Sequence, residues 1–351
     1  MGTKRAKSLD PDAVVPWLTS SFKRNGWKGL LAGVGEDDCG VIQIEHTCVV
    51  LSVDFLNATP IAEQLGLGGE RVLGRLAVAA TLADLLGSGA APRALLVAVT
   101  VPHGYREHLF KEIMRGAKSE SMRWNVPIIA GDTKLGRARA VSTCGLGTVD
   151  SPKQLFLANR AQPGDIIFAS GPLGTCAAAT CISSGRVAVP RWAHRAITVP
   201  QLPMGLSRRL AVLQVAHGGI DISDGLAADL RRMCNASRVG AILDVDTIPI
   251  DPRVYSVADR EQVPPWAFSL SSGGDFQFIV TVPPKARAAV ERLGFSRIGM
   301  ITRERQFWLR DNAQVLSYKL PDVGHRDRQG QRFLNEIRAI IRRVSNERKK
   351  A

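Results

Sequence analysis

Aspartates in this chain recur where short apolar segments end or where glycines form a turn. Asp54 follows Cys48–Val53, a β-branched run typical of a buried strand. Asp132 follows an apolar run in the same way, and Asp84 lies in a helical segment made otherwise of Ala and Leu. The full set is Asp37, Asp38, Asp54, Asp84, Asp132, Asp221, Asp224 and Asp275. Carboxylates at the edge of a core are costly to desolvate, so several that converge require cations between them.

The ligand types in the chain select the kind of cation. The six cysteines are scattered without a Cys-x-x-Cys pair, and the six histidines show no metal-ligand spacing. Oxygen ligands alone favour Mg²⁺, which usually bridges protein carboxylates to nucleotide phosphates. The sequence therefore predicts a Mg²⁺-dependent phosphoryl-transfer site.

Several of these motifs also have a purely structural interpretation. Gly33–Gly40 is either a polar turn or a loop whose glycines let the backbone approach phosphates, and it lacks the Gly-Lys-Ser/Thr ending of a Walker A loop. Asp84 could be an exposed helical residue, although its apolar surroundings leave little polar face. Ser223 and Asp224 could cap the helix that follows, whose N-terminus would equally favour a phosphate. Ser271–Asp275 is either a loop before a strand or a ligand-facing turn.

Apolar periodicity divides the chain into two α/β units. We expect the first over residues 13–150 and the second over 151–324, because a polar stretch ending in Gln162-Pro163-Gly164-Asp165 separates them. The first is predicted to hold strands at 48–53, 94–101, 127–130 and 138–148 and helices at 70–86 and 106–124. The second is predicted to hold strands at 166–169, 241–245 and 276–282 and helices at 175–183, at 226–233 and after a Pro-rich connection at 190–203.

The order of these motifs resembles the thiamine-monophosphate kinase family, within the aminoimidazole-ribotide-synthetase-like superfamily, over about residues 13–325. The most specific match is Ile220–Leu230, which agrees in full with the family pattern Ile-Asp-Ile-Ser-Asp-Gly-Leu-x-x-Asp-Leu. Asp54 occupies the position of the family's strand-ending aspartate. The other matches, the last in degraded form, are Gly35–Gly40, Ala83–Pro92, Ala130–Thr133, Ala161–Asp165 and Ser272–Phe278.

The resemblance implies a fold and an activity. The fold is a two-domain aminoimidazole-ribotide-synthetase-like fold of the α+β or α/β class, with an N-terminal mixed sheet that pairs across a homodimer and a C-terminal α/β domain. The activity is an ATP-dependent, Mg²⁺-requiring transfer of the γ-phosphoryl group to thiamine monophosphate, which gives thiamine diphosphate. Such a reaction depends on positioning and charge neutralisation more than on a general base.

The same resemblance implies roles for single residues. The implied metal ligands are Asp37, Asp38, Asp54, Asp84, Asp132 and Asp224. Asp132 and Asp224 would also act in catalysis. The residues implied to lie near ATP are Asp37, Gly131, Thr133, Asp221 and Ser223. Asn57 and Asp275 would contact the small phosphorylated acceptor.

The chain departs from the family pattern mainly around the acceptor. Thr81–Asp84 lacks the family's hydroxyl beside the aspartate, and Gly273–Phe278 reads Gly-Gly-Asp-Phe-Gln-Phe where the family has Gly-Glu-Asp-Tyr-Glu-Leu. Two alternatives therefore stay open. One is a divergent member of the superfamily that uses ATP to phosphorylate or activate another small acceptor. The other is a non-catalytic descendant that binds nucleotide or nucleic acid.

Net charge and the C-terminal segment bear on the partners. The 46 basic and 32 acidic residues give a net charge of +14, which favours anionic partners in general. Residues 325–351 carry nine Lys/Arg beside apolar residues at helical spacing. We expect a helix packed on the domain with a solvated basic face, and a nucleic-acid-binding arm is the less favoured interpretation. Because the chain has no bilayer-length apolar run and no signal-peptide pattern, a cytoplasmic protein is expected.

Overall fold

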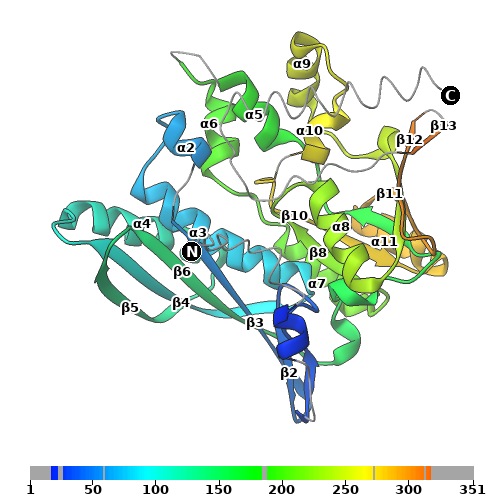
Figure 1. Ribbon diagram of the computed structural model, residues 1–351, viewed down its shortest axis with the longest axis horizontal. Coiled ribbons are helices and arrows are strands. Elements are labelled where there is room, and N and C mark those ends of the chain that lie inside the picture. The colour runs from blue at the N-terminus through cyan, green and yellow to red at the C-terminus, as the bar shows by residue number, and fades with distance from the viewer. Residues whose placement is uncertain are drawn as a thin grey trace, which may run out of the picture.

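Two mixed β-sheets, each packed against helices, make up the computed structural model of this chain (Figure 1). The structure describes residues 17–22, 27–57, 60–183, 188–271, 273–311 and 314–317. The predicted basic tail at 325–351 and the expected start of the first unit at residue 13 lie outside these residues. Within the described ranges, no helix has both the length and the apolarity needed to cross a bilayer.

The first sheet has six strands in the order β1-β2-β3-β6-β4-β5. Only β4 and β5 run parallel, and the other neighbours are antiparallel. Along β3, Val50 and Ser52 are buried while Leu51 and Val53 are exposed, so this sheet has one covered and one open face. The bounds are β1 Leu30–Ala32, β2 Gly40–Ile44, β3 Thr47–Leu56, α2 Pro60–Gln64, α3 Glu70–Gly87, β4 Ala91–Pro102, α4 Glu107–Trp124, β5 Ile128–Gly136 and β6 Ala140–Val149.

The second sheet has seven strands in the order β13-β12-β9-β11-β7-β10-β8. At one end of this order, β10 and β8 are buried along their whole length. The strands are β7 Ile166–Ala169, β8 Gly219–Ile222, β9 Gly240–Asp244, β10 Gln277–Val282, β11 Ser296–Thr302, β12 Phe307–Asp311 and β13 Gln314–Ser317. The α-helices are α5 Thr175–Ser183, α6 Arg191–Thr198, α7 Met204–Leu213, α8 Leu226–Ser237, α9 Pro252–Glu261, α10 Trp266–Ser271 and α11 Arg287–Leu293. Short 3₁₀ helices are η1 Pro152–Gln154, η2 Ala158–Arg160, η3 Val245–Thr247 and η4 Pro284–Ala286.

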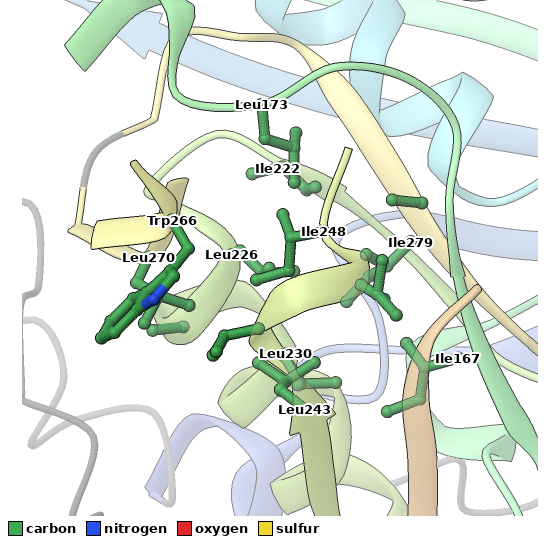
Figure 2. Packing of buried hydrophobic residues seen from close by; sticks show 14 of the residues in the cluster. Ile167, Leu173, Ile222, Leu226, Leu230, Leu243, Ile248, Trp266, Leu270 and Ile279 are labelled. Atoms are coloured by element: carbon green, nitrogen blue, oxygen red, sulfur yellow. The ribbon is translucent and has the colours of Figure 1, made fainter. Parts of the chain in front are cut away.

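The largest core cluster lies between this second sheet and its helices. Figure 2 shows Leu226 and Leu230 of α8 beside Trp266 of α10, with Ile167 and Ile279 from the sheet in the same cluster. All five side chains are at most 7% exposed. Burial of this apolar face anchors α8, which begins directly after the Ser223-Asp224 turn.

Most of the predicted elements are confirmed, as is the two-unit α/β architecture. The helices expected at 70–86 and 106–124 are α3 and α4, and the strand expected at 166–169 is β7. β5 continues well past its expected end at residue 130, because it pairs with β4 through the Gly-Asp-Thr sequence. The Pro-rich connection contains an unpredicted helix, α6, with Pro190 at its N-cap, where the missing N–H is tolerated.

The two units meet where the C-terminal end of α3 lies against β8 (Figure 1). A Cβ atom at Gly87 would stand only 2.6 Å from the backbone nitrogen of Asp221, so this close approach requires glycine. Ser207 Oγ donates a hydrogen bond of 2.7 Å to the Leu86 carbonyl and ties α7 to the same helix end. Backbone packing therefore brings Asp84, one turn earlier in α3, toward Asp221.

We expect Gly87→Ala to weaken this junction. The added methyl group forces α3 away from β8, and overpacking of this kind lowers the free energy of unfolding by about 1–3 kcal/mol. Gly205→Ala in α7 is the matched control, because a Cβ atom there meets nothing within 4 Å. That change should be neutral or stabilising by about 0.5–1 kcal/mol. Urea unfolding compares the two variants, and equal stabilities would contradict the tight contact at Gly87.

Candidate active site

Three carboxylates from separate segments converge at the junction of the two units. Asp38 lies in the turn before β2, Asp84 in the last turn of α3, and Asp221 on β8. One oxygen of each lies within 4.8 Å of the other two, and we call these residues the acidic cluster. Asp38 is exposed, Asp84 half-buried and Asp221 buried. The cluster therefore opens to solvent at Asp38, where an ion can enter.

Strand β3 supplies polar groups to the same place. Ser52 and Asp54 are two residues apart on the strand, so both side chains lie on its covered face. The Ser52 hydroxyl donates a hydrogen bond to Asp84 Oδ2. The charge of Asp54 raises the pKa values of both Asp84 and Asp221. The structure thus brings Asp38, Asp54 and Asp84, three of the six predicted metal ligands, together with Asp221.

Burial and mutual repulsion favour the protonated forms of these carboxyl groups. Burial is the largest effect and raises the pKa of Asp84 well above its usual value; the charges of Asp221, Asp54 and Asp38 raise it further. The pKa of Asp221 is raised in the same way, first by burial and then by Asp38 and Asp229. Asp221 Oδ2 is buried and has no hydrogen-bond partner in the described part of the chain. Carboxylates whose oxygens lie within 4.8 Å of one another are stable together only when some are protonated or when a cation bridges them.

This donor set fits a divalent cation. Its members are oxygen ligands, they come from rigid elements of both units, and one buried oxygen has no partner among the described residues. Hard cations such as Mg²⁺ take carboxylate oxygens together with waters. Asp38, Asp84 and Asp221 could hold such an ion, with Asp54 adding charge.

Asp37 has a different position from its neighbour Asp38. Its Oδ1 accepts the N–H of Cys39 over 2.9 Å, and its Oδ2 accepts the N–H of Ala158 in η2 over 2.6 Å. Burial, followed by the charge of Asp38, raises the pKa of Asp37 to about 7. Asp37 therefore links the turn that carries Asp38 to the segment between the two sheets.

Asp224 is paired with an arginine that the sequence analysis does not identify. Arg232 Nη2 donates hydrogen bonds to Asp224 Oδ2 and, over 2.6 Å, to Asp229 Oδ1. The other oxygen of Asp229 accepts the N–H groups of Asp224 and Gly225 over 2.9 and 3.1 Å. Arg232 Nη1 also lies 3.7 Å from Asp38 Oδ1. This network joins Asp224 to the edge of the acidic cluster.

Asp132 and its neighbours stand apart from the cluster. They lie on β5, an edge strand that β4 and β6 separate from β3. Asp132 Oδ1 accepts the N–H of Thr133 over 2.8 Å, and its Oδ2 lies 3.6 Å from Lys134 Nζ. The Asp132 side chain is 60% exposed. Gly131, Asp132 and Thr133 therefore make no contact with the acidic cluster of the same chain in the part that the structure describes.

The two predicted acceptor residues also lie apart from the cluster. Asp275 holds the N-terminal turn of α5: its Oδ2 accepts the N–H of Gly174 over 2.6 Å and its Oδ1 that of Cys176 over 2.9 Å. Burial raises the pKa of Asp275 to about 6. Asn57 is exposed just after the end of β3. Ser223 lies closer, since it directly precedes Asp224 and follows β8.

Three residues of the site were given no role from the sequence: Ser52, Arg232 and Asp229, the last aspartate of the matched motif Ile220–Leu230. Ser52 precedes Asp54 by one strand period, so alternation would have placed both on one face. Asp229 and Arg232 have the i, i+3 spacing of an ion pair on a helix. Both signals were available, but neither distinguishes a site from an ordinary surface contact.

Two family models match this chain in order. They are AIR synthase related protein, N-terminal domain, over residues 36–149, and AIR synthase related protein, C-terminal domain, over residues 162–311. A thiamine-monophosphate kinase from Haemophilus influenzae is 31% identical over 263 residues, which cover 73% of this chain and 76% of that protein. One from Rhodopirellula baltica is 27% identical over 81% of this chain and 82% of that protein.

Other relatives carry a different name. A putative hydrogenase expression/formation protein from Methanocaldococcus jannaschii is 30% identical over 80% of this chain and 79% of that protein.

Among solved structures, AaThiL complexed with AMPPCP and TMP has a TM-score of 0.75 at 17% identity; the match covers 91% of this chain and 98% of that one. At this identity the likeness supports the fold. The chain belongs to the AIR synthase related protein family and is a thiamine-monophosphate-kinase-like member of it.

Proposed function

We propose that this protein is a thiamine-monophosphate kinase, which transfers the γ-phosphoryl group of ATP to thiamine monophosphate with the help of Mg²⁺. The observation that carries the proposal is the convergence of Asp38, Asp84 and Asp221 within 4.8 Å where the two units meet. The kinase name of the relatives from Haemophilus influenzae and Rhodopirellula baltica supports the same reaction.

Different residues at the junction of the two units would bind the metal ion and the phosphates. Asp38, Asp84 and Asp221 would hold Mg²⁺, which when bound neutralises phosphate charge and orients the transferring group. We propose Asp38 rather than Asp37 as the ligand from their common turn, because both Asp37 oxygens already accept backbone N–H groups. The partial positive charge at the N-terminus of α8 favours a phosphate near Asp224. Asp132 and Thr133 stay predicted ligands of metal and nucleotide.

A second candidate is ATP-dependent phosphorylation or activation of a different small acceptor. The relative from Methanocaldococcus jannaschii favours it, since its name is not that of a thiamine-monophosphate kinase. The position of Asp275 favours it as well, because both of its carboxylate oxygens accept backbone hydrogen bonds at α5 and are less available to an acceptor.

Product analysis separates these functions. The protein is incubated with ATP and Mg²⁺, with or without thiamine monophosphate, and thiamine diphosphate and ADP are measured. We expect both products in equal amounts and only when the acceptor is present. ADP formation that depends on another small phosphorylated or amide-bearing compound would favour the second candidate. Nucleotide binding with no turnover on any acceptor would favour a non-catalytic descendant.

We further propose that the protein is a homodimer that pairs through the open face of its first sheet. Leu51, Val53 and Phe55 alternate along β3 on this face and are 42%, 69% and 67% exposed. Leu96 of β4, which is 37% exposed, adds to the same side. A contiguous apolar face of this kind marks an interaction site, and a second copy would bury it without exposing polar backbone.

Asp84→Asn should affect turnover and stability in opposite directions. Loss of a ligand charge lowers Mg²⁺-dependent turnover by on the order of 100-fold. Loss of repulsion with Asp221 raises the unfolding midpoint of the protein in EDTA, since a buried like-charge pair is removed. Asp259→Asn on the exposed side of α9 is the control and should change neither. Near-normal turnover of the Asp84 variant would remove the acidic cluster from the mechanism.

Without divalent ions, stability should fall as pH rises from about 4 to about 7. The folded-state pKa values of Asp37 and Asp229 are raised from 3.8 to about 7, mainly by burial. The native protein then holds protons that the unfolded chain has released, so the free energy of unfolding decreases through this window. The pKa values of Asp84 and Asp221 in the acidic cluster are raised in the same direction, so Mg²⁺, which replaces protons at these two carboxylates, should flatten the profile. Urea midpoints across the window, in EDTA and in Mg²⁺, measure the difference, and superimposable profiles would count against a metal site.

Val53→Asp should prevent dimerisation while leaving the chain folded. The substitution places a charge on the exposed apolar face, where pairing would bury it without a partner. Val212→Asp on α7 is a matched control, because Val212 is 64% exposed but lies outside the sheet. Light scattering on a sizing column gives the mass of each variant. A monomeric unsubstituted protein, or a dimeric Val53 variant, would exclude this interface.

A further inference from the structure

One guanidinium connects the acidic cluster to the turn before α8. Arg232 contacts Asp224, Asp229 and Asp38, which come from two segments far apart in the sequence. The Asp224 and Asp229 side chains are 6% and 0% exposed, whereas the Arg232 side chain is 44% exposed. The partly exposed guanidinium thus contacts two carboxylates, of Asp224 and Asp229, that are themselves buried.

The buried carboxylates depend on this charge. Desolvation is the largest single effect on Arg232 and lowers its pKa, yet the charges of Asp229, Asp38, Asp224 and Asp221 together raise it above its usual value. A buried carboxylate left without a partner destabilises a protein strongly. Arg232 forms an ion pair with Asp224 and lies 3.7 Å from Asp38, so its charge acts on both carboxylates.

The three contacts differ in strength and in geometry. Asp229 lies one turn before Arg232 on the same helix, and its second oxygen holds the backbone of Asp224 and Gly225. This contact is local and need not change when the site fills. The contacts to Asp224 and Asp38 are made across the mouth of the cluster, and Asp38 is the more distant at 3.7 Å. A rotation of the half-exposed side chain about its own bonds would break these two without moving α8.

We propose that Arg232 is a resident counter-ion that competes with the divalent cation. In the metal-free protein it supplies the positive charge for Asp224 and Asp38; when the cation binds, the cation neutralises both carboxylates in its place, and Asp229 retains Arg232. The inference rests on the metal site of the proposed function. It makes Arg232 a positioning residue that sets the affinity for the cation and the shape of the empty site.

Competition predicts that removing the charge strengthens cation binding. A positive charge beside a divalent ion opposes it, so Arg232→Gln should bind Mn²⁺ at least about tenfold more tightly than the unsubstituted protein. Arg232→Lys keeps the charge but loses the planar fork that reaches two carboxylates at once, so its affinity should lie between the two. If Arg232 instead served only to order the Asp224 turn, both variants would bind Mn²⁺ more weakly.

The experiment is a calorimetric titration of the full chain with Mn²⁺, in the absence of nucleotide and acceptor. Arg287→Gln is the matched control, because Arg287 is 52% exposed and forms an ion pair with Glu291 of its own helix, away from the acidic cluster. Its affinity should equal that of the unsubstituted protein. Thermal unfolding is a second measurement: in EDTA the Arg232→Gln variant should melt below the control, and saturating Mg²⁺ should close the gap.

The outcomes separate this inference from the proposed function. Mn²⁺ affinity that is unchanged or weaker in Arg232→Gln, with normal binding by the unsubstituted protein, overturns the counter-ion role alone. Tighter Mn²⁺ binding by the variant supports that role even if thiamine diphosphate is never formed. Absence of Mn²⁺ binding by every variant overturns the counter-ion role together with the metal site. A melting gap in EDTA that persists at saturating Mg²⁺ also contradicts displacement, because the ion would then not replace the lost charge.

Discussion

The close approach of Asp84 and Asp221 is the constraint on which the site depends. One comes from a helix of the first unit and the other from a strand of the second, and Gly87 allows the backbones to meet at a distance that a Cβ atom would prevent. The contact brings like charges together in a partly desolvated place, which raises both pKa values. A fold that keeps such an arrangement lowers its own metal-free stability, which is typical of functional sites. A positive charge at the acidic cluster is therefore needed to offset the repulsion between these carboxylates.

Much of the fold could be predicted because the elements next to the site are strongly periodic. α3, α4 and β7 follow from apolar spacing over their whole length. The missed elements are short or depend on partners distant in sequence. β1 has three residues and exists through its pairing with β2, and the C-terminal strands β11 to β13 have bounds that only the order of the second sheet determines. Local sequence carries little information about such strands, because their stability comes from neighbouring strands.

The residue types of the site could also be predicted, but the division of roles among them could not. Asp37 and Asp38 are adjacent, and only the contact of Asp37 with Ala158, 121 residues later, separates a structural carboxylate from one that faces the cluster. Asp224 is an acceptor for Arg232 in the described state, which its motif alone does not indicate. Asp132 ends an apolar run as Asp54 does, yet it lies on an exposed edge strand. Long-range contacts decide each case, and a single sequence does not display them.

The departures from the family pattern have local structural reasons that leave the acidic cluster intact. Where the family has glutamate, Gly274 has a φ of 94°, and a Cβ atom there would lie 2.7 Å from Cys176 Sγ. Gln277 replaces a second glutamate and uses both ends of its amide: Nε2 donates to the Gln201 carbonyl and Oε1 accepts from Ser170 Oγ, each over 3.0 Å. A carboxylate could not donate the first of these bonds. The loop before β10 is thus adapted to its own packing, while Asp38, Asp84 and Asp221 keep a geometry suited to a cation. The departures at Gly274 and Gln277 therefore fall on the side predicted to contact the acceptor, while the side proposed to bind phosphate and metal keeps its three carboxylates.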